Sequence, residues 1–290
     1  MVIDWTTRLA KAIAMTQFRI ETSPYRIRAT RGAAALGQNT VVDTSAAKMV
    51  FLEGRHPEYY VPDADVDWKK LATDTALDAS TSAATVTNGV AADSNTVEGL
   101  GAFETIGVDG QIIGQRFTDG PAAGLVRFDF KAMDGWFEEE EQLFVHARDP
   151  YVRVDIIEAS RRVEVTVGGV LVAATDRPRL VTETGLPGRW YIPRIDINLG
   201  LLQPSPTQSS CGYKGQAKWW NVAIEGHDVV ANAAWGYQRP VPTASKLASL
   251  ICFFAEKEAV ETTVDGERVE MPAFGPSMIN PSLYLQNQTL

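Results

Sequence analysis

Lys48-Met-Val-Phe-Leu-Glu-Gly-Arg-His-Pro-Glu-Tyr-Tyr-Val-Pro62 recurs in altered form as Arg179-Leu-Val-Thr-Glu-Thr-Gly-Leu-Pro-Gly-Arg-Trp-Tyr-Ile-Pro193. In both stretches an apolar run leads to Glu, Gly and Pro, and then to an aromatic pair, an aliphatic residue and a second Pro. Asp65 and Asp196 follow at the same offset. Internal similarity of this kind predicts two copies of one structural unit.

The second copy continues into Cys211-Gly-Tyr-Lys-Gly215, whereas the first copy has no Cys or Lys at the equivalent place. We therefore expect the first copy to be degenerate and the function to lie in the second. The predicted organisation is a helical arm over residues 1–24, a first copy over 25–155 with a polar insertion at 72–99, a second copy over 156–275 and a tail over 276–290.

Short alternating segments such as Arg162–Val167, separated by Gly and Pro turns such as Gly168-Gly169, predict an all-β fold with few helices. Such strands form either a small barrel or two packed sheets. One helix is predicted over residues 240–251, where apolar residues recur at helical spacing. The acidic run Glu138–Glu141 is predicted to be a solvated face.

The composition limits the possible partners. A net charge of −9 argues against nucleic acid and against an anionic membrane surface, because binding to phosphates depends largely on Lys and Arg. No run of about 18 apolar residues and no signal-peptide core is present, so a cytoplasmic protein is expected. With two cysteines, no four-cysteine zinc site is possible, and no His or Cys pair has metal-ligand spacing. We expect no metal and no cofactor.

The candidate catalytic residues are Cys211, Tyr213 and Lys214, which two glycines bracket. A nearby ammonium could lower the pKa of Cys211 and make it a nucleophile. Alternatively, Lys214 could add to a carbonyl group or contact a ligand as a cation. A purely structural alternative is that Cys211 packs in a core and that Lys214 pairs with Glu183 or Asp196.

Aromatic residues are concentrated in the second copy. Since side chains alternate between the faces of a strand, Trp219 and Trp220 must point in opposite directions. An apolar pocket with a few converging polar groups is typical of small-molecule sites. The candidate ligand-binding residues are Glu183, Trp190, Tyr191, Arg194, Asp196, Trp219, Trp220, Trp235 and Tyr237.

Five motifs in order carry a resemblance to a known family: Glu183-Thr-Gly-Leu-Pro187, Arg189-Trp-Tyr-Ile-Pro193, Cys211-Gly-Tyr-Lys-Gly215, Ala234-Trp-Gly-Tyr237 and Phe253-Phe-Ala-Glu256. The chain resembles the family of domain of unknown function 427, in its tandem-copy form. The resemblance implies two β-tent domains, similar to the Mss4-like group, in which antiparallel sheets meet at an angle. This sequence departs from the family pattern at Gly212, where Pro is usual, and at Gly236, where Ser is usual.

Three functions are compatible with these patterns. The first is binding of a small molecule in an aromatic-lined pocket of the second domain, with the first domain as an intrachain pseudo-dimer partner and a homodimer as a further option. The second is an enzyme that acts on a carbonyl or other electrophilic substrate through Lys214 or Cys211. The third is a structural or interaction module without a ligand.

Overall fold

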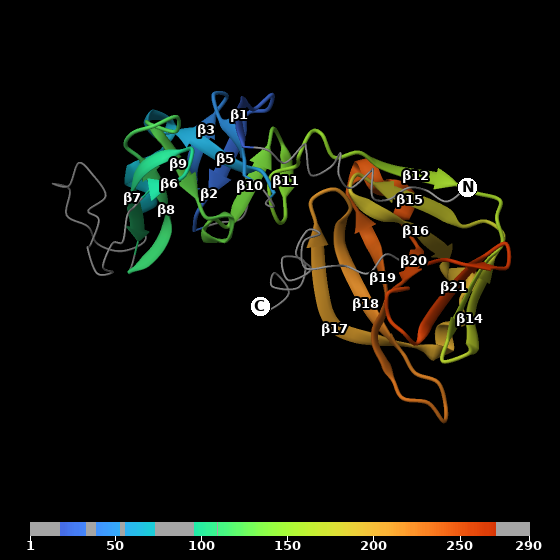
Figure 1. Ribbon diagram of the computed structural model, residues 1–290. Coiled ribbons are helices and arrows are strands. Elements are labelled where there is room, and N and C mark those ends of the chain that lie inside the picture. Colours follow the sequence, from blue (N-terminus) through green and yellow to red (C-terminus); the bar gives the residue numbers. More distant parts are fainter. Residues whose placement is uncertain (1–17, 33–38, 53–55, 73–95, 109, 271–290) are drawn as a thin grey trace. The chain divides into compact units, whose positions relative to one another are not determined.

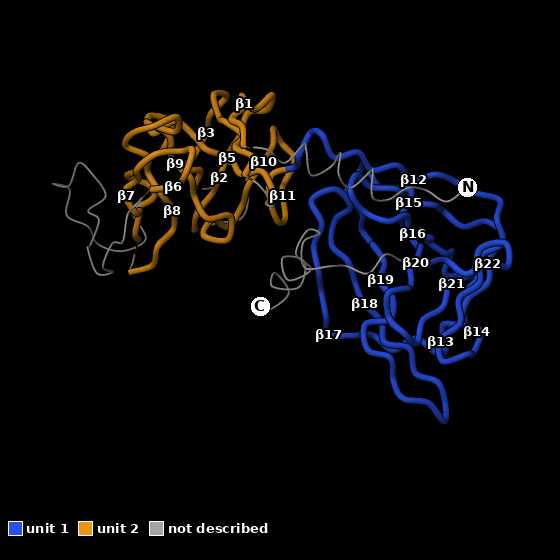
Figure 2. Tube along the Cα trace, viewed as in Figure 1, with its two compact units in different colours: residues 1–15, 148–290 blue, residues 16–147 orange. Residues whose placement is uncertain are grey.

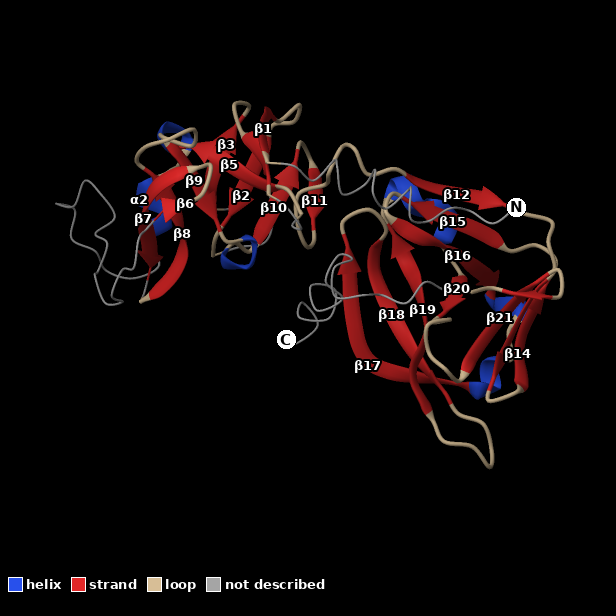
Figure 3. Cartoon of the chain, viewed as in Figure 1, coloured by secondary structure: helices blue, strands red, loops and turns tan. Residues whose placement is uncertain are grey.

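The computed structural model describes residues 18–32, 39–52, 56–72, 96–108 and 110–270 (Figure 1). The chain divides into two compact units (Figure 2), which we call the N-terminal unit (residues 16–147) and the C-terminal unit (residues 148–290 with 1–15). Most of the predicted arm, of the 72–99 insertion and of the tail lies outside the described residues. Figure 3 shows strands and connecting loops with only short helical segments, so the all-β prediction is confirmed.

The N-terminal unit contains a seven-stranded and a four-stranded sheet, in which all pairings are antiparallel. The order in the larger sheet is β1 (Arg19–Thr22), β4 (Lys48–Phe51), β5 (Glu58–Pro62), β9 (Leu125–Phe128), β8 (Gln111–Phe117), β7 (Gly101–Val108) and β6 (Thr96–Val97). The order in the smaller sheet is β11 (Glu141–Leu143), β10 (Gly135–Glu138), β2 (Ile27–Thr30) and β3 (Thr40–Thr44). The helical segments are η1 (Asp63–Asp65), α2 (Trp68–Ala72) and η2 (Phe130–Ala132).

The C-terminal unit has the same arrangement. Its larger sheet has the order β12 (Val154–Glu158), β15 (Arg179–Glu183), β16 (Leu186–Pro193), β20 (Leu250–Phe253), β19 (Val230–Pro240), β18 (Gly215–Val222) and β17 (Leu202–Cys211). Its smaller sheet has the order β14 (Val170–Thr175), β13 (Val163–Val167), β21 (Val260–Val264) and β22 (Glu267–Arg268). Its described residues also form the 3-10 segments η3 (Arg194–Asp196), η4 (Leu199–Leu201) and η5 (Pro242–Leu247).

The strand orders of the two units correspond one to one, with β1 equivalent to β12, β4 to β15 and so on through both sheets. The pairing registers make the correspondence precise to the residue. Lys48 pairs with Tyr60 in the N-terminal unit, and Arg179 pairs with Tyr191 in the C-terminal unit. Positions in one unit can therefore be compared directly with positions in the other.

Side-chain alternation gives the larger sheet of the C-terminal unit two buried faces. On the inner face, residues such as Ile192 and Ile251 pack against valines of the smaller sheet. On the outer face, Tyr191 and Cys252 belong to a separate apolar cluster, which also includes Ala244 and Leu247 of η5. We call this apolar cluster, which contains Tyr191, Cys252, Ala244 and Leu247, the outer-face cluster.

The structure corrects two predicted helical segments, the first of them only in its described part. Arg19–Thr22, assigned to the helical arm, forms strand β1 and pairs with β4. Residues 240–251 form the 3-10 segment η5 and the start of strand β20. Ala244, Leu247 and Leu250 are buried at a spacing of three residues, which fits a 3-10 turn followed by a strand better than a continuous α-helix.

The solvated acidic face is also wrong for its first residue. Glu138 is 2% exposed and accepts a hydrogen bond of 2.8 Å from the Tyr59 hydroxyl. It lies in strand β10 and pairs with Ile27, so strand geometry rather than a helical turn directs its side chain. The equivalent position in the C-terminal unit is Val264, which pairs with Val163.

A threonine–aspartate hydrogen bond joins the same two elements in each unit. The Thr44 hydroxyl donates to Asp65 at 2.6 Å, and the Thr175 hydroxyl donates to Asp196 at 2.8 Å. Arg177 also donates to Asp196 at 3.1 Å. Because this bond recurs in both units, it is part of the common framework.

We expect the Asp196→Ala substitution to lower the free energy of unfolding by about 1.5 kcal/mol at neutral pH, since it removes the acceptor for Thr175. Hydrogen bonds from Arg177 and Thr175 hold the pKa of Asp196 below its usual value of 3.8. A carboxylate whose pKa is lowered by folding stabilises the folded state at pH values above its unfolded-state pKa. This stabilisation is lost as the pH falls through the pKa of the folded state. The difference between variant and wild type in urea denaturation should therefore shrink as the pH falls below about 4.

The control is Asp176→Ala, which removes a 76% exposed carboxylate that pairs with Arg162. A surface ion pair of this kind contributes at most about 1 kcal/mol. An equal effect of both substitutions would contradict a framework role for Asp196.

Candidate functional site

A turn between β17 and β18 determines where Lys214 lies. The Lys214 N–H donates to the Cys211 carbonyl at 3.3 Å, and the Lys214 carbonyl accepts from Val241 at 3.1 Å. Gly215 has φ +105°, and a Cβ atom there would lie 3.0 Å from the Arg239 carbonyl oxygen. The turn therefore needs glycine at this position, and it fixes the backbone on both sides of Lys214.

Lys214 and Glu183 form a buried ion pair. The Lys214 Nζ lies 2.5 Å from Glu183 Oε2, and the two side chains are 8% and 9% exposed. Cys211 and Tyr213 lie close enough to Glu183 for its negative charge to contribute to raising their pKa values. The geometry thus unites three of the predicted residues, Cys211, Tyr213 and Lys214, with Glu183.

An aromatic group continues from this pair along the outer face. Tyr191 belongs to the same cluster as Cys211, and its hydroxyl accepts a hydrogen bond of 3.0 Å from Trp235 Nε1. The Trp219 ring lies 5.3 Å from Trp235, and Phe254 lies within 6.1 Å of both rings. Tyr237 is also a member of the outer-face cluster. Trp219 is thus the tryptophan of the adjacent pair that faces the predicted polar residues.

Burial keeps the thiols and phenols of this site protonated. It raises the pKa values of Cys211 and Tyr213, and it raises that of Tyr191 well above the usual value. The pKa of Cys252 is raised to about 12 for the same reason. Lys214 acts in the opposite direction on Cys211, but desolvation is the larger effect. A thiolate nucleophile at neutral pH is therefore disfavoured.

Four of the predicted ligand-binding residues are not brought to this site. Trp190 and Trp220 pack in the core between the two sheets. The Arg194 guanidinium lies over the Trp220 ring, 5.8 Å from its centroid. Asp196 is bonded to Thr175 and Arg177 in the framework contact described above.

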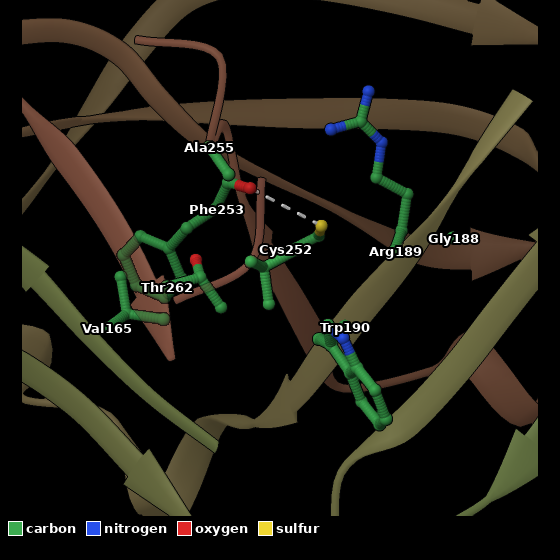
Figure 4. Close-up of a pocket in the computed structure, with 9 residues that line it drawn as sticks. Val165, Gly188, Arg189, Trp190, Cys252, Phe253, Ala255 and Thr262 are labelled. Atoms are coloured by element: carbon green, nitrogen blue, oxygen red, sulfur yellow. Dashed lines mark hydrogen bonds between the residues drawn. The ribbon is translucent and has the colours of Figure 1, made fainter. Parts of the chain in front are cut away.

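A small cavity lies beside strands β16 and β20, where Arg189 and Trp190 point in opposite directions (Figure 4). Its volume is about 10 Å³, which is room for about one water molecule. Cys252 and Thr262 also line it. This cavity is too small for an organic ligand.

An ion pair beside the aromatic group was missed in the sequence. Arg189 donates two hydrogen bonds to Glu256, and its guanidinium lies 5.5 Å from the Trp235 centroid. The two residues are far apart in the chain, so local spacing gives no signal for their pairing. Phe254 was also missed, although its place in the quoted motif Phe253-Phe-Ala-Glu256 was a signal.

Comparison of the two units separates framework contacts from contacts of the C-terminal unit alone. The position of Arg189 is occupied in the N-terminal unit by Glu58, which forms an ion pair of 2.7 Å with Arg127. Both units thus have a charged pair at this place, but only one position is shared, because Arg127 corresponds to Cys252 and not to Glu256.

The Glu183–Lys214 pair does not recur. Lys214 precedes Gly215 in the turn, and the equivalent turn places Leu100 before Gly101, with the matching hydrogen bond to Val97. Glu183 is four residues beyond the partner of Tyr191, and Leu52 is four residues beyond the partner of Tyr60. Leu100 and Leu52 belong to one apolar cluster in the N-terminal unit. The framework therefore accepts two leucines where the C-terminal unit has two charges.

Within the described residues, no three His, Cys, Asp or Glu side chains are grouped as metal ligands. Among the same residues, no helix has both the length and the apolar character that a membrane span requires.

We expect the double variant Glu183→Leu/Lys214→Leu to unfold with nearly the wild-type free energy. Each single substitution leaves one buried charge without its partner and should cost about 3 kcal/mol. The double substitution reproduces the leucine pair of the N-terminal unit and should cost less than about 1 kcal/mol. Urea denaturation of the four proteins gives the coupling energy of the pair, and additive single effects would contradict it.

We also expect neither thiol to react rapidly with a disulfide reagent in the folded protein at neutral pH. Both cysteines are buried and their pKa values are raised, so the thiolate fraction is very small. Urea-denatured protein, in which both thiols react, is the control. Rapid labelling of Cys211 in the native state would restore it as a candidate nucleophile.

The comparisons with known proteins agree with this focus on the C-terminal unit. A search of curated proteins found no match. Residues 155–269, which run from β12 to β22, match the model of a family described as Domain of unknown function (DUF427). This segment of the chain, which contains the Glu183–Lys214 pair, is therefore similar to that domain family.

Proposed function

We propose that the C-terminal unit binds a small polar molecule at the Glu183–Lys214 pair. The observation that carries the proposal is the difference between two equivalent frameworks, one with Leu52 and Leu100 and the other with a buried ion pair. A buried ion pair contributes little net stability compared with packed apolar residues. A contact that the fold does not require, and that is costly to desolvate, is better explained by recognition than by stability.

The chemistry of the pair favours a ligand without net charge. Lys214 can donate to an acceptor on the ligand while Glu183 accepts from a neighbouring donor. Because the two charges cancel, a charged ligand would enter a poorly solvated site without compensation. Trp219 and Phe254, which are only partly buried, offer an aromatic surface for the apolar part of such a molecule.

Binding is supported over covalent catalysis. Cys211 is held as a thiol by burial, and Lys214 is paired at 2.5 Å with a carboxylate that favours its ammonium form. An ammonium cannot form a Schiff base until it loses its proton. Both groups therefore suit hydrogen-bonded recognition better than nucleophilic attack.

The test is a thermal-shift screen with a library of neutral and zwitterionic polar metabolites. A compound present at about 100 times its Kd should stabilise the folded protein by about 2.7 kcal/mol. The shift should be lost in Glu183→Leu/Lys214→Leu, which keeps the framework. It should persist in Arg162→Leu/Asp176→Leu, a matched removal of an ion pair whose side chains are 45% and 76% exposed. A shift that survives in the first variant would place the ligand elsewhere.

A further inference from the structure

A short segment contacts both parts of the chain that carry the ion pair, strand β15 and the turn between β17 and β18. Residues 148–153, which we call the strap, contain a turn in which the N–H groups of Tyr151 and Val152 donate to Asp149. At one end, the Asp149 N–H donates to the Tyr213 hydroxyl at 2.8 Å. At the other end, Arg153 exchanges two hydrogen bonds of 3.0 Å with Thr184.

The two attachment points flank the site directly. Tyr213 immediately precedes Lys214, and Thr184 immediately follows Glu183. The Arg153 end leads into strand β12, which pairs along its whole length with β15. The contacts of the Asp149 end include a hydrogen bond to the side chain of Tyr213, a residue in a turn. A side-chain contact on a turn opens more easily than a strand pairing within a sheet.

The ion pair needs such an opening if it is to meet a ligand, since both side chains are less than one-tenth exposed. We propose that the strap is a gate over the Glu183–Lys214 pair, with the Asp149–Tyr213 hydrogen bond as its latch and the Arg153–Thr184 contact as its hinge. This inference rests on the proposed binding function, because it explains how a ligand reaches the pair.

The comparison between the units links Tyr213 to the ion pair, because neither has a counterpart in the N-terminal unit. The equivalent of Tyr213 in the N-terminal unit is Gly99, which lies between Val97 and Leu100 in the matching turn. Gly99 has no side chain that could hold a strap. The latch and the ion pair are therefore both specific to the C-terminal unit.

Tyr213→Phe tests the gate without any ligand, because it removes the acceptor for the Asp149 N–H and keeps the ring. Cys211 is buried where this turn begins. Its alkylation by iodoacetamide, followed by mass spectrometry of the Cys211 peptide, therefore reports opening of the turn. We expect the labelling rate of Cys211 to rise about fivefold, the factor that corresponds to loss of one ordinary hydrogen bond. Hydrogen exchange at the Asp149 amide should also accelerate.

The matched control is Tyr237→Phe, the same change at another tyrosine of the outer-face cluster. The N-terminal unit has Phe117 at the equivalent position, so the substitution suits the framework. Labelling of Cys211 should stay at the wild-type rate in this control. Cys252, fully buried in the same cluster, should stay slow in both variants and thereby exclude global unfolding.

Unchanged labelling in Tyr213→Phe, or an equal rise in both variants, would overturn the gate. This outcome is independent of the metabolite screen. Faster labelling without any ligand in the screen would leave the gate standing and remove the binding proposal. A ligand whose binding requires the ion pair, found together with unchanged labelling, would support the binding proposal and exclude the gate.

Discussion

The alternation of side chains along the larger sheet is the constraint on which the C-terminal unit depends. It sends Ile192 and Ile251 toward the smaller sheet and Tyr191 and Cys252 to the outer face. Both faces are covered, and the cover of the outer face includes the 3-10 segment η5. Lys214 and Glu183 are buried because they lie on this covered face, so their charges have to be satisfied by each other rather than by water.

Because the two units share one framework, each polar contact in one unit can be compared with the equivalent positions in the other. The threonine–aspartate bond recurs in both units, so the architecture itself explains it. The Glu183–Lys214 pair occurs at positions that two leucines fill in the other unit. The comparison also works in the other direction, because the buried contact between Tyr59 and Glu138 has no counterpart at Val264. The N-terminal unit thus has leucines at these two positions and has a buried polar contact of its own between Tyr59 and Glu138.

Sequence reasoning was sufficient for features that depend on local pattern. Alternation and turn residues predicted the all-β class, and alternation also predicted that Trp219 and Trp220 face opposite ways. Sequence reasoning left open which of the two tryptophans faces the outer side, because strand register decides this. A register shift between Gln216 and Lys218 precedes Trp219 on β18, and no sequence pattern announces it. Asp196 stood out because it recurs with Asp65, but recurrence marked the common framework rather than a ligand site.

The protonation of the outer-face cluster decides what kind of chemistry the site can support. Its thiols and phenols are neutral at physiological pH, because desolvation outweighs the neighbouring charge. Neutral thiols and phenols donate and accept hydrogen bonds but are weak nucleophiles. An ammonium and a carboxylate 2.5 Å apart provide one strong donor and one strong acceptor at a fixed separation. Under the proposed function, a ligand would be selected by the order of its own donors and acceptors, because the glycine-bounded turn already fixes the backbone around Lys214.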